Sequence, residues 1–161
     1  MTIRLREAVP GDEATLLALL RGLAEYERLT DRFRATEAGL AAALFGPRPA
    51  AQAVLAEEDA AGEALGMAIW HRIFSSFACR TGFWLEDIFV RPEARGRGVG
   101  RMLLAEMARR LAAEDGETIA WSVLDWNAPA LDFYRGLGAE PEDGGWTRMR
   151  LRGEALERLR G

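Results

Sequence analysis

Hydrophobic and polar side chains alternate over residues 2–7, TIRLRE, and this period of two predicts a short strand at the start of the chain. The next segment has helical spacing and begins near Pro10, with an apolar stripe formed by Leu16, Leu20, Leu23 and Ala24. A second helix is predicted over Thr36–Phe45, where Thr36 is the N-cap and Gly46-Pro47 ends the helix.

The middle of the chain is rich in the β-branched and aromatic residues that favour strands. Three strands are predicted there, at residues 52–57, 65–74 and 83–90. The segments that follow are predicted as a long helix from Gly98 to about Glu114, a strand over Thr118–Leu124, a helix over Pro129–Leu137 and a last strand over Trp146–Leu151, with room for a short strand around Glu140.

The element order βααβββαβαβ predicts a mixed α/β fold rather than the regular βαβαβ of a dinucleotide-binding domain. We expect a strongly twisted central sheet, antiparallel in its early strands and parallel around the strand–helix–strand unit, with helices on both faces. The 161 residues fit one domain, residues 1–161, since a single core usually organises about 100–150 residues.

The amino-acid composition excludes several kinds of site and several classes of partner. The single cysteine and single histidine argue against an internal disulfide and against a multi-Cys or multi-His metal site, so no metal is expected. The chain has no lysine, which rules out a Schiff-base lysine. Scattered arginines and a net charge of −4 argue against nucleic acid as a partner.

Since no apolar run approaches the roughly 20 residues of a membrane span and the N-terminus lacks a signal-peptide core, we expect no membrane partner and a cytoplasmic location.

A glycine-rich segment follows the third of the central strands and precedes the long helix: Arg95-Gly96-Arg97-Gly98-Val99-Gly100. Alternating glycines leave backbone N–H groups unshielded, and the helix N-terminus adds partial positive charge, as a pyrophosphate site requires. Arg95, Arg97 and Arg101 can add charge-assisted contacts. A purely structural turn is the alternative interpretation, because such loops are common.

Larger motifs make the sequence familiar. The strand LEDIFV, the segment RPEARGRGVGRMLL and the block WNAPALDFYRGLGA together resemble the GNAT superfamily of N-acetyltransferases. The LED-x-FV strand, the AEYE segment and the WN block are similar to its diamine (spermidine/spermine) and thialysine acetyltransferase branch. The resemblance covers nearly the whole chain and implies a GNAT-like fold and acetyl-CoA as the acetyl donor.

The resemblance assigns the donor's contacts. It implies that residues Arg95 to Gly100 hold the CoA pyrophosphate, with Arg101 in the first turn of the helix. The backbone of Ile88, Phe89 and Val90 would bind pantetheine in the manner of an added strand. Asn127 would contact the cofactor, although a plain helix N-cap is an equally good interpretation of an asparagine before Ala128-Pro129.

The reaction requires a base, because a free aliphatic amine with a pKa near ~10.4 is protonated at neutral pH. By resemblance, Glu86 is that base, directly or through water, and Tyr134 donates a proton to the departing sulfur. Glu86 and Asp87 are adjacent, so on a regular strand they face opposite sides of the sheet unless a bulge intervenes. Asp87 is the alternative base, or a group that orients the amine or binds a distant cationic end of the substrate. Either carboxylate could instead be a structural partner of an arginine.

Tyr26 and Glu27 match the positions that contact the polyamine in this branch, and an aromatic, acidic mouth suits an alkylammonium chain. A solvated helix end is the alternative. His71 reads as a core or surface histidine rather than a catalytic one, and Cys79 lacks an evident partnering base.

We therefore expect a ternary-complex acetyltransferase acting on the primary amine of a polyamine, diamine or lysine-like amino acid. The alternatives are an enzyme for a larger amine, such as an aminoglycoside or a protein N-terminus, and a non-catalytic acyl-CoA-binding module. A homodimer is expected from the branch and from the predicted strand Trp146–Leu151, which would leave a sheet edge open to pairing.

Overall fold

The computed structural model describes residues 2–58, 62–142, 145 and 147–160. These residues form two compact units, Met1–Leu124 and Asp125–Gly161. The first unit contains the strands β1 (Ile3–Glu7), β2 (Gln52–Glu58), β3 (Ala64–Ser75), β4 (Arg80–Val90) and β5 (Thr118–Ala120), and the helices α1 (Glu13–Tyr26), α2 (Glu37–Phe45) and α3 (Val99–Ala113). The second unit contains α4 (Ala128–Gly136) and α5 (Glu154–Glu157).

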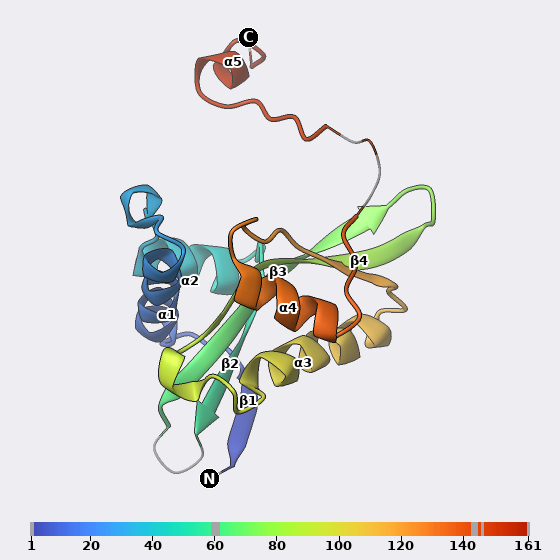
Figure 1. Cartoon of the computed structure of the whole chain (residues 1–161). Coiled ribbons are helices and arrows are strands. Elements are labelled where there is room, and N and C mark those ends of the chain that lie inside the picture. Colours follow the sequence, from blue (N-terminus) through green and yellow to red (C-terminus); the bar gives the residue numbers. More distant parts are fainter. Residues whose placement is uncertain (1, 59–61, 143–144, 146, 161) are drawn as a thin grey trace. The chain divides into compact units, whose positions relative to one another are not determined.

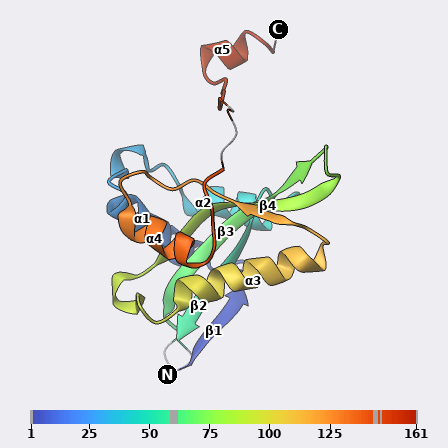
Figure 2. The same cartoon turned by 45° about the vertical axis from the view of Figure 1, so that its right-hand side comes forward.

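A five-stranded mixed sheet in the order β1-β2-β3-β4-β5 organises the first unit. Strands β1 to β4 pair with one another in antiparallel fashion, and β5 pairs with β4 in parallel. Helices α1 and α2 lie on one face of this sheet, and α3 lies on the other (Figures 1 and 2). The predicted mixed α/β fold with helices on both faces is therefore confirmed.

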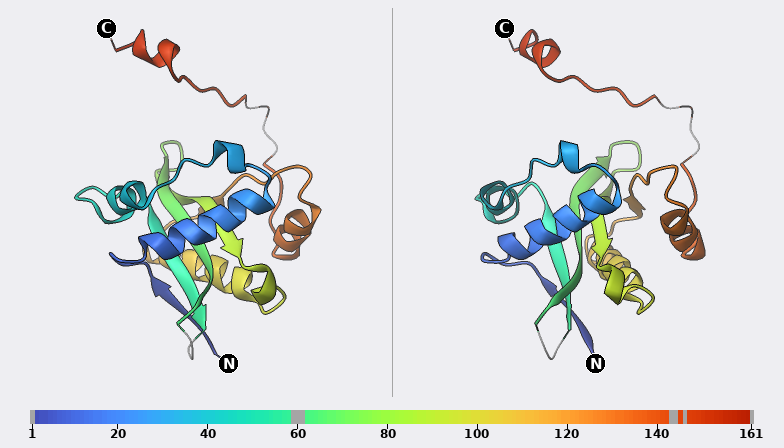
Figure 3. Two further views of the ribbon diagram at one scale, coloured as in Figure 1. Left: turned by 90° about the vertical axis from the view of Figure 1, so that its left-hand side faces the viewer. Right: turned by 60° about the vertical axis from the view of Figure 1, so that its left-hand side comes forward.

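Each face of the sheet has its own core. On the α3 face, Trp70 and Phe83 pack with the buried stripe of α3, which consists of Val99, Leu103, Met107 and Leu111. On the α1 face, Met67, Ile69 and Phe89 pack with Leu16 and Leu19 of α1, which crosses the strands in Figure 3. Alternation along β3 explains the division, because neighbouring residues on a strand point to opposite faces.

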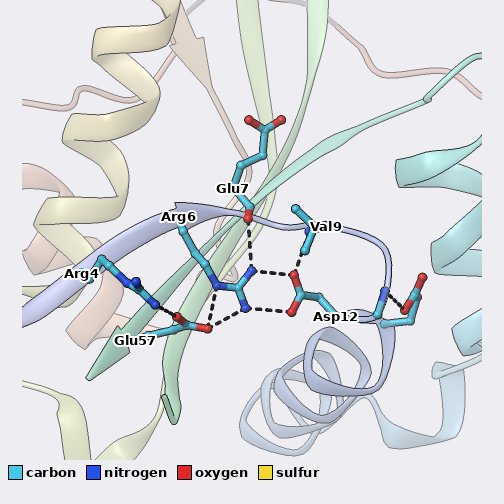
Figure 4. A network of polar contacts seen from close by, with 8 residues as sticks. Arg4, Arg6, Glu7, Val9, Asp12 and Glu57 are labelled. Atoms are coloured by element: carbon cyan, nitrogen blue, oxygen red, sulfur yellow. Dashed lines mark hydrogen bonds and ion pairs between the residues drawn. The ribbon is translucent and has the colours of Figure 1, made fainter. Parts of the chain in front are cut away.

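A network of ion pairs fixes the start of α1 to the sheet (Figure 4). The Arg6 guanidinium donates to both carboxylate oxygens of Asp12, at 2.6 and 2.8 Å, and to Glu57, which also accepts from Arg4. Asp12 accepts from the Val9 backbone as well, at 2.7 Å. Asp12 and Glu57 are buried, and their hydrogen bonds to Arg6 lower the pKa of both carboxyls. The network thus neutralises two buried charges and sets the direction in which α1 leaves β1.

Three predicted strands need correction. The structure has no strand in residues 147–151, and Trp146 lies outside the described residues. No strand forms around Glu140, and the strand predicted over Thr118–Leu124 ends at Ala120. The physical reason is the same for each. Alternation supplies a suitable face, but a strand also requires a ladder of backbone hydrogen bonds with a neighbouring strand, and no ladder assigned within the described residues includes these segments.

None of the helices in the described part of the chain is long and apolar enough to cross a membrane. The same residues contain no group of three or more histidine, cysteine or acidic side chains placed to hold a metal ion.

Candidate functional site

An irregularity in the pairing of β3 with β4 shapes the candidate site. Ile69 pairs with Asp87 and the next residue, Trp70, pairs with Leu85, so Glu86 is an extra residue on β4. A register shift of this kind is a β-bulge, which bends a strand and redirects its side chains. The sequence left open whether β4 is regular or bulged at this position, and the structure has the bulge.

The bulge brings two carboxylates to one side of the sheet. Leu85 belongs to the core on the α3 face, so its neighbour Glu86 points away from that face. Asp87 pairs with Ile69, and Ile69 belongs to the core on the α1 face. Glu86 and Asp87 therefore both lie toward α1, whereas a regular strand would have separated them.

Glu27, directly after α1, completes a group of three acidic side chains, which we call the carboxylate trio (Glu27, Glu86 and Asp87). Burial raises the pKa of Asp87 to about 6, with further contributions from the negative charges of Glu86 and Glu27. Burial also raises the pKa of Glu27. Within the described residues neither Glu27 nor Asp87 forms an ion pair, so the trio holds negative charge that the protein does not neutralise.

A histidine lies next to the trio. The Nε2 atom of His71 is 3.8 Å from Oε2 of Glu86, and the two side chains are 39% and 57% exposed. The sequence interpretation of His71 as an ordinary core or surface residue missed this proximity. No local pattern could have revealed it, because the two residues lie on different strands and approach each other only through the bulged register.

The glycine-rich segment forms the turn that leads into α3. Gly96 and Gly98 have φ angles of +75° and +81°, which side-chain-bearing residues rarely adopt, and Gly98 is the N-cap of α3. A Cβ at either glycine would project into open space, with no heavy atom within 4 Å. The first N–H groups of a helix have no partner within it, so this turn presents donors and room for an anionic ligand.

The arginines of this segment have contacts within the protein. The Arg95 guanidinium lies 4.6 Å from the centre of the Tyr26 ring, and its Nε donates to the Val90 carbonyl. Arg97 forms an ion pair with Glu58 at 2.6 Å, and Arg101 is exposed on the first turn of α3. Arg95 thus connects the glycine-rich turn to Tyr26 at the end of α1.

One side of β4 is open next to this turn. Strand β5 pairs only with Gly82, Phe83 and Trp84, so within the described residues no strand pairs with Ile88, Phe89 or Val90 on that side. On their other side these three residues pair with β3. The backbone of residues 88–90 can therefore accept an extended ligand in the way that a sheet edge accepts a strand.

Asn127 and Tyr134 belong to the second unit. The Asn127 side chain accepts a hydrogen bond from the Ala130 backbone N–H at 3.3 Å, which confirms its role as the N-cap of α4. Tyr134 lies on α4, with its ring centre 5.2 Å from that of Phe133. The bulge, the carboxylate trio and the glycine-rich turn all belong to the first unit, which includes neither Asn127 nor Tyr134.

Comparison with known proteins gives matches over nearly the whole chain. Residues 17–139 match the family described as Acetyltransferase (GNAT) family. The thialysine N-epsilon-acetyltransferase of Bos taurus is 36% identical, over 99% of this chain and 98% of its own. The L-ornithine N5-acetyltransferase NATA1 of Arabidopsis thaliana is 30% identical, over 99% and 88%. A V. cholerae integron cassette protein of known structure shares the fold, with a TM-score of 0.80 and 23% identity over 99% of this chain and 98% of its own.

Proposed function

The chain belongs to the acetyltransferase (GNAT) family, and from this premise we propose that it transfers acetyl from acetyl-CoA to the primary amine of a small cationic metabolite. The family resemblance seen in the motifs is confirmed, and the relatives named thialysine acetyltransferase fall in the expected branch. Polyamines, diamines and lysine-like amino acids are the proposed acceptors. The relatives named for thialysine and ornithine support an amino acid as the acceptor. A human relative named spermidine/spermine N(1)-acetyltransferase-like protein 1, which is 26% identical, supports a polyamine as the acceptor.

The carboxylate trio is the observation that carries this proposal. Burial and mutual repulsion raise the pKa of Asp87, which means that its ionised form lacks a compensating charge. An ammonium group of the acceptor supplies that charge, so a cationic amine is attracted where a neutral one is not. Glu27 and Tyr26 at the end of α1 extend the same acidic, aromatic surface toward a second cationic group of the substrate.

Glu86 is the proposed base. It lies on the same side of the sheet as Asp87, so one residue can hold the ammonium while the other removes its proton. The neutral amine then attacks the thioester carbonyl. Tyr134 is the proposed acid, which donates its hydroxyl proton to the departing sulfur.

Acetyl-CoA fits the donor side of the first unit. The positive-φ turn at Gly96 and Gly98 leaves open the space that a Cβ would fill, which suits a closely approaching pyrophosphate. In this proposal the phosphates are bound by Arg95, Arg97 and Arg101 and by the turn residues Val99 and Gly100. The pantetheine is bound by the backbone of Ile88, Phe89 and Val90. Asn127 contacts the cofactor near α4. No metal takes part in this proposal.

We also propose that the enzyme acts as a homodimer in the cytoplasm. The predicted edge strand no longer supports the dimer, since residues 147–151 form none. Its support is instead the β3–β4 hairpin, where Phe74 is 67% exposed and Phe77 is fully exposed. The cytoplasm is supported by the donor, because cells make and keep acetyl-CoA inside.

The test is a panel of amines with acetyl-CoA, in which release of free thiol is followed. A diamine or basic amino acid should have a higher kcat/KM than a neutral alkylamine of matching length, and salt should raise KM by screening the trio. Glu86→Gln should lower kcat/KM by about 10²–10⁴-fold, as is typical for loss of a general base, and Tyr134→Phe should mainly lower kcat. Glu25→Gln, at an exposed position of α1, is the matched control. Equal kcat/KM for the diamine and the neutral amine would contradict the role of the trio.

A further inference from the structure

His71 lies in contact range of the proposed base but has no part in the mechanism above. On β3 it follows Trp70, whose side chain is in the core of the α3 face, so His71 points to the opposite face with Glu86 and Asp87. Its Nε2 atom is 3.8 Å from Oε2 of Glu86. That distance is longer than a hydrogen bond, so proton transfer requires the two partly exposed side chains to rotate toward each other.

The other ring nitrogen determines the tautomer. The Nδ1 atom of His71 lies 3.2 Å from the backbone carbonyl oxygen of Arg72. A carbonyl oxygen only accepts, so Nδ1 must carry the hydrogen and donate it. In neutral His71 the lone pair is then on Nε2, the atom that faces Glu86. The imidazole is therefore oriented to accept a proton from the carboxyl group of Glu86.

The His71 side chain is also 39% exposed, so its ring reaches solvent. It lines a surface pocket of about 600 Å³ together with Leu44 and Phe45 of α2, the loop of residues 49–51, and parts of β1 and β2. The charged groups that share this pocket are Glu7 and Arg72. Arg72 is held by Glu114 at 2.5 and 2.6 Å and Glu7 lies 3.4 Å from Arg110, so both have ionic partners outside the trio. Glu86 is thus the carboxylate placed to exchange a proton with His71.

We propose that His71 is the proton exit of the acetyl-transfer site. The inference rests on the proposed function, since it takes Glu86 as the base. Glu86 removes one proton from the substrate ammonium, which leaves the neutral amine and a carboxylic acid. The Glu86 O–H bond then breaks as a bond forms to Nε2 of His71, which restores the carboxylate and leaves an imidazolium. The imidazolium gives its Nε2 proton to water or buffer in the pocket, so His71 returns to its starting tautomer after each turnover.

The role differs from that of a residue that merely holds Glu86 in place. A proton carrier is replaceable by a diffusible base, whereas a structural contact is not. Without His71 the protonated Glu86 must give its proton to water directly, and water is a weaker base than imidazole. Imidazole added to the buffer is small enough to enter the surface pocket and can accept the proton in place of His71.

The test measures kcat of His71→Ala in dilute, non-imidazole buffer with the amine that wild type uses best, and acetylated amine is quantified directly. We expect kcat to fall about tenfold, less than for loss of the base itself because water still accepts the proton from Glu86. Imidazole should restore kcat in a concentration-dependent, saturable way, while KM for acetyl-CoA stays at the wild-type value. Wild type should not respond to imidazole.

Two controls separate the possible outcomes. Gln52→Ala alters the same pocket without removing a titratable group and should keep wild-type kcat. Glu86→Gln should not be rescued by imidazole, since the diffusible base replaces the carrier and not the base that contacts the amine. Unchanged kcat in His71→Ala, or a loss that imidazole leaves unrestored, would overturn the proton-exit role. Both outcomes leave the proposed function intact as long as wild type acetylates the amine and Glu86→Gln does not.

Discussion

Asp87 shows at the scale of a single residue how the site opposes the stability of the fold. Its pKa is raised from 3.8 to about 6, so the folded protein binds this proton more tightly than the unfolded chain does. The effect of this carboxyl on stability is therefore most favourable below about pH 4 and becomes less favourable as the pH rises from about 4 to about 6. At neutral pH the ionised carboxylate is a net cost to folding, and the proposed attraction of a cationic substrate would explain why the residue is retained.

Asp87→Asn should remove that cost. At pH 7.5 the variant should be more stable than wild type by about 1–3 kcal/mol, since one pKa unit corresponds to about 1.4 kcal/mol. At pH 4 the gain should disappear, because Asp87 is already protonated there in the folded state. Thermal or urea unfolding at both pH values measures the difference, with the exposed Asp31→Asn as the control. A gain that is larger at pH 4 than at pH 7.5 would show that the carboxylate is not repelled in the folded protein.

At the scale of elements, the turn into α3 is the part of the donor site with the clearest backbone requirement. Gly98→Ala places a methyl group in the space proposed for the pyrophosphate, at a φ of +81°. Gly11→Ala is a matched control, because Gly11 has a φ of +106° and equally open surroundings but precedes α1.

Both variants should lose about 1–2 kcal/mol of stability from backbone strain. Only Gly98→Ala should weaken acetyl-CoA binding, by about tenfold or more, because its Cβ blocks the approach of the ligand to the backbone. Calorimetric titration compares the two. Equal affinities for acetyl-CoA in the two variants would mean that the turn does not bind the donor.

The ion-pair network that connects β1, β2 and the start of α1 depends on Arg6. Arg6→Met should destabilise the protein by about 3 kcal/mol, because buried Asp12 loses its ionic partner and Glu57 keeps only Arg4. Since the pKa values of Asp12 and Glu57 are lowered in the fold, this contribution is present above about pH 4 and is lost as the pH falls further.

Denaturation across pH 3 to 7 checks this expectation. The deficit of Arg6→Met should shrink toward pH 3, where the carboxyls become protonated and no longer need a partner. Arg109→Met breaks a pair with Glu106 on α3 that solvent screens, so it should cost much less stability than Arg6→Met does. A pH-independent deficit in Arg6→Met would assign the loss to packing of the arginine stem instead of its charge.

At the scale of the whole molecule, the exposed tip of the β3–β4 hairpin predicts association. Light scattering at micromolar concentration should give twice the 17.8 kDa chain mass. Phe77→Ser should shift the mass toward the monomer, because it removes a fully exposed apolar ring, whereas Ser76→Ala on the same loop should not. A monomer mass for wild type, with full activity retained on dilution, would rule out the dimer as the working form.

Local features of the chain were enough to predict the family, the main helices and the long strands. The helices and the long strands follow from local spacing and caps, such as Thr36, whose side chain accepts from the Gly39 N–H as an N-cap should. The glycine-rich turn was recognisable because a positive φ and a helix start leave a mark on residue choice at fixed offsets. These features are local, so a single chain is enough to reveal them.

Which residues come together in the site depends on contacts between segments that are distant in the chain. The bulge at Glu86 depends on how β3 and β4 pair, and it is this register that moves Glu86 and Asp87 to one face and brings His71 to Glu86. Burial raises the pKa of Asp87 most, and the negative charges of Glu86 and Glu27 add to it. Glu27 is sixty residues earlier in the chain and is brought close by the packing of α1. The segment 147–151 alternates like a strand but does not form one, since alternation describes one face while a strand also requires a ladder of hydrogen bonds with a neighbouring strand. Register, burial and partners are properties of pairs of segments, and a local pattern contains only one segment of each pair.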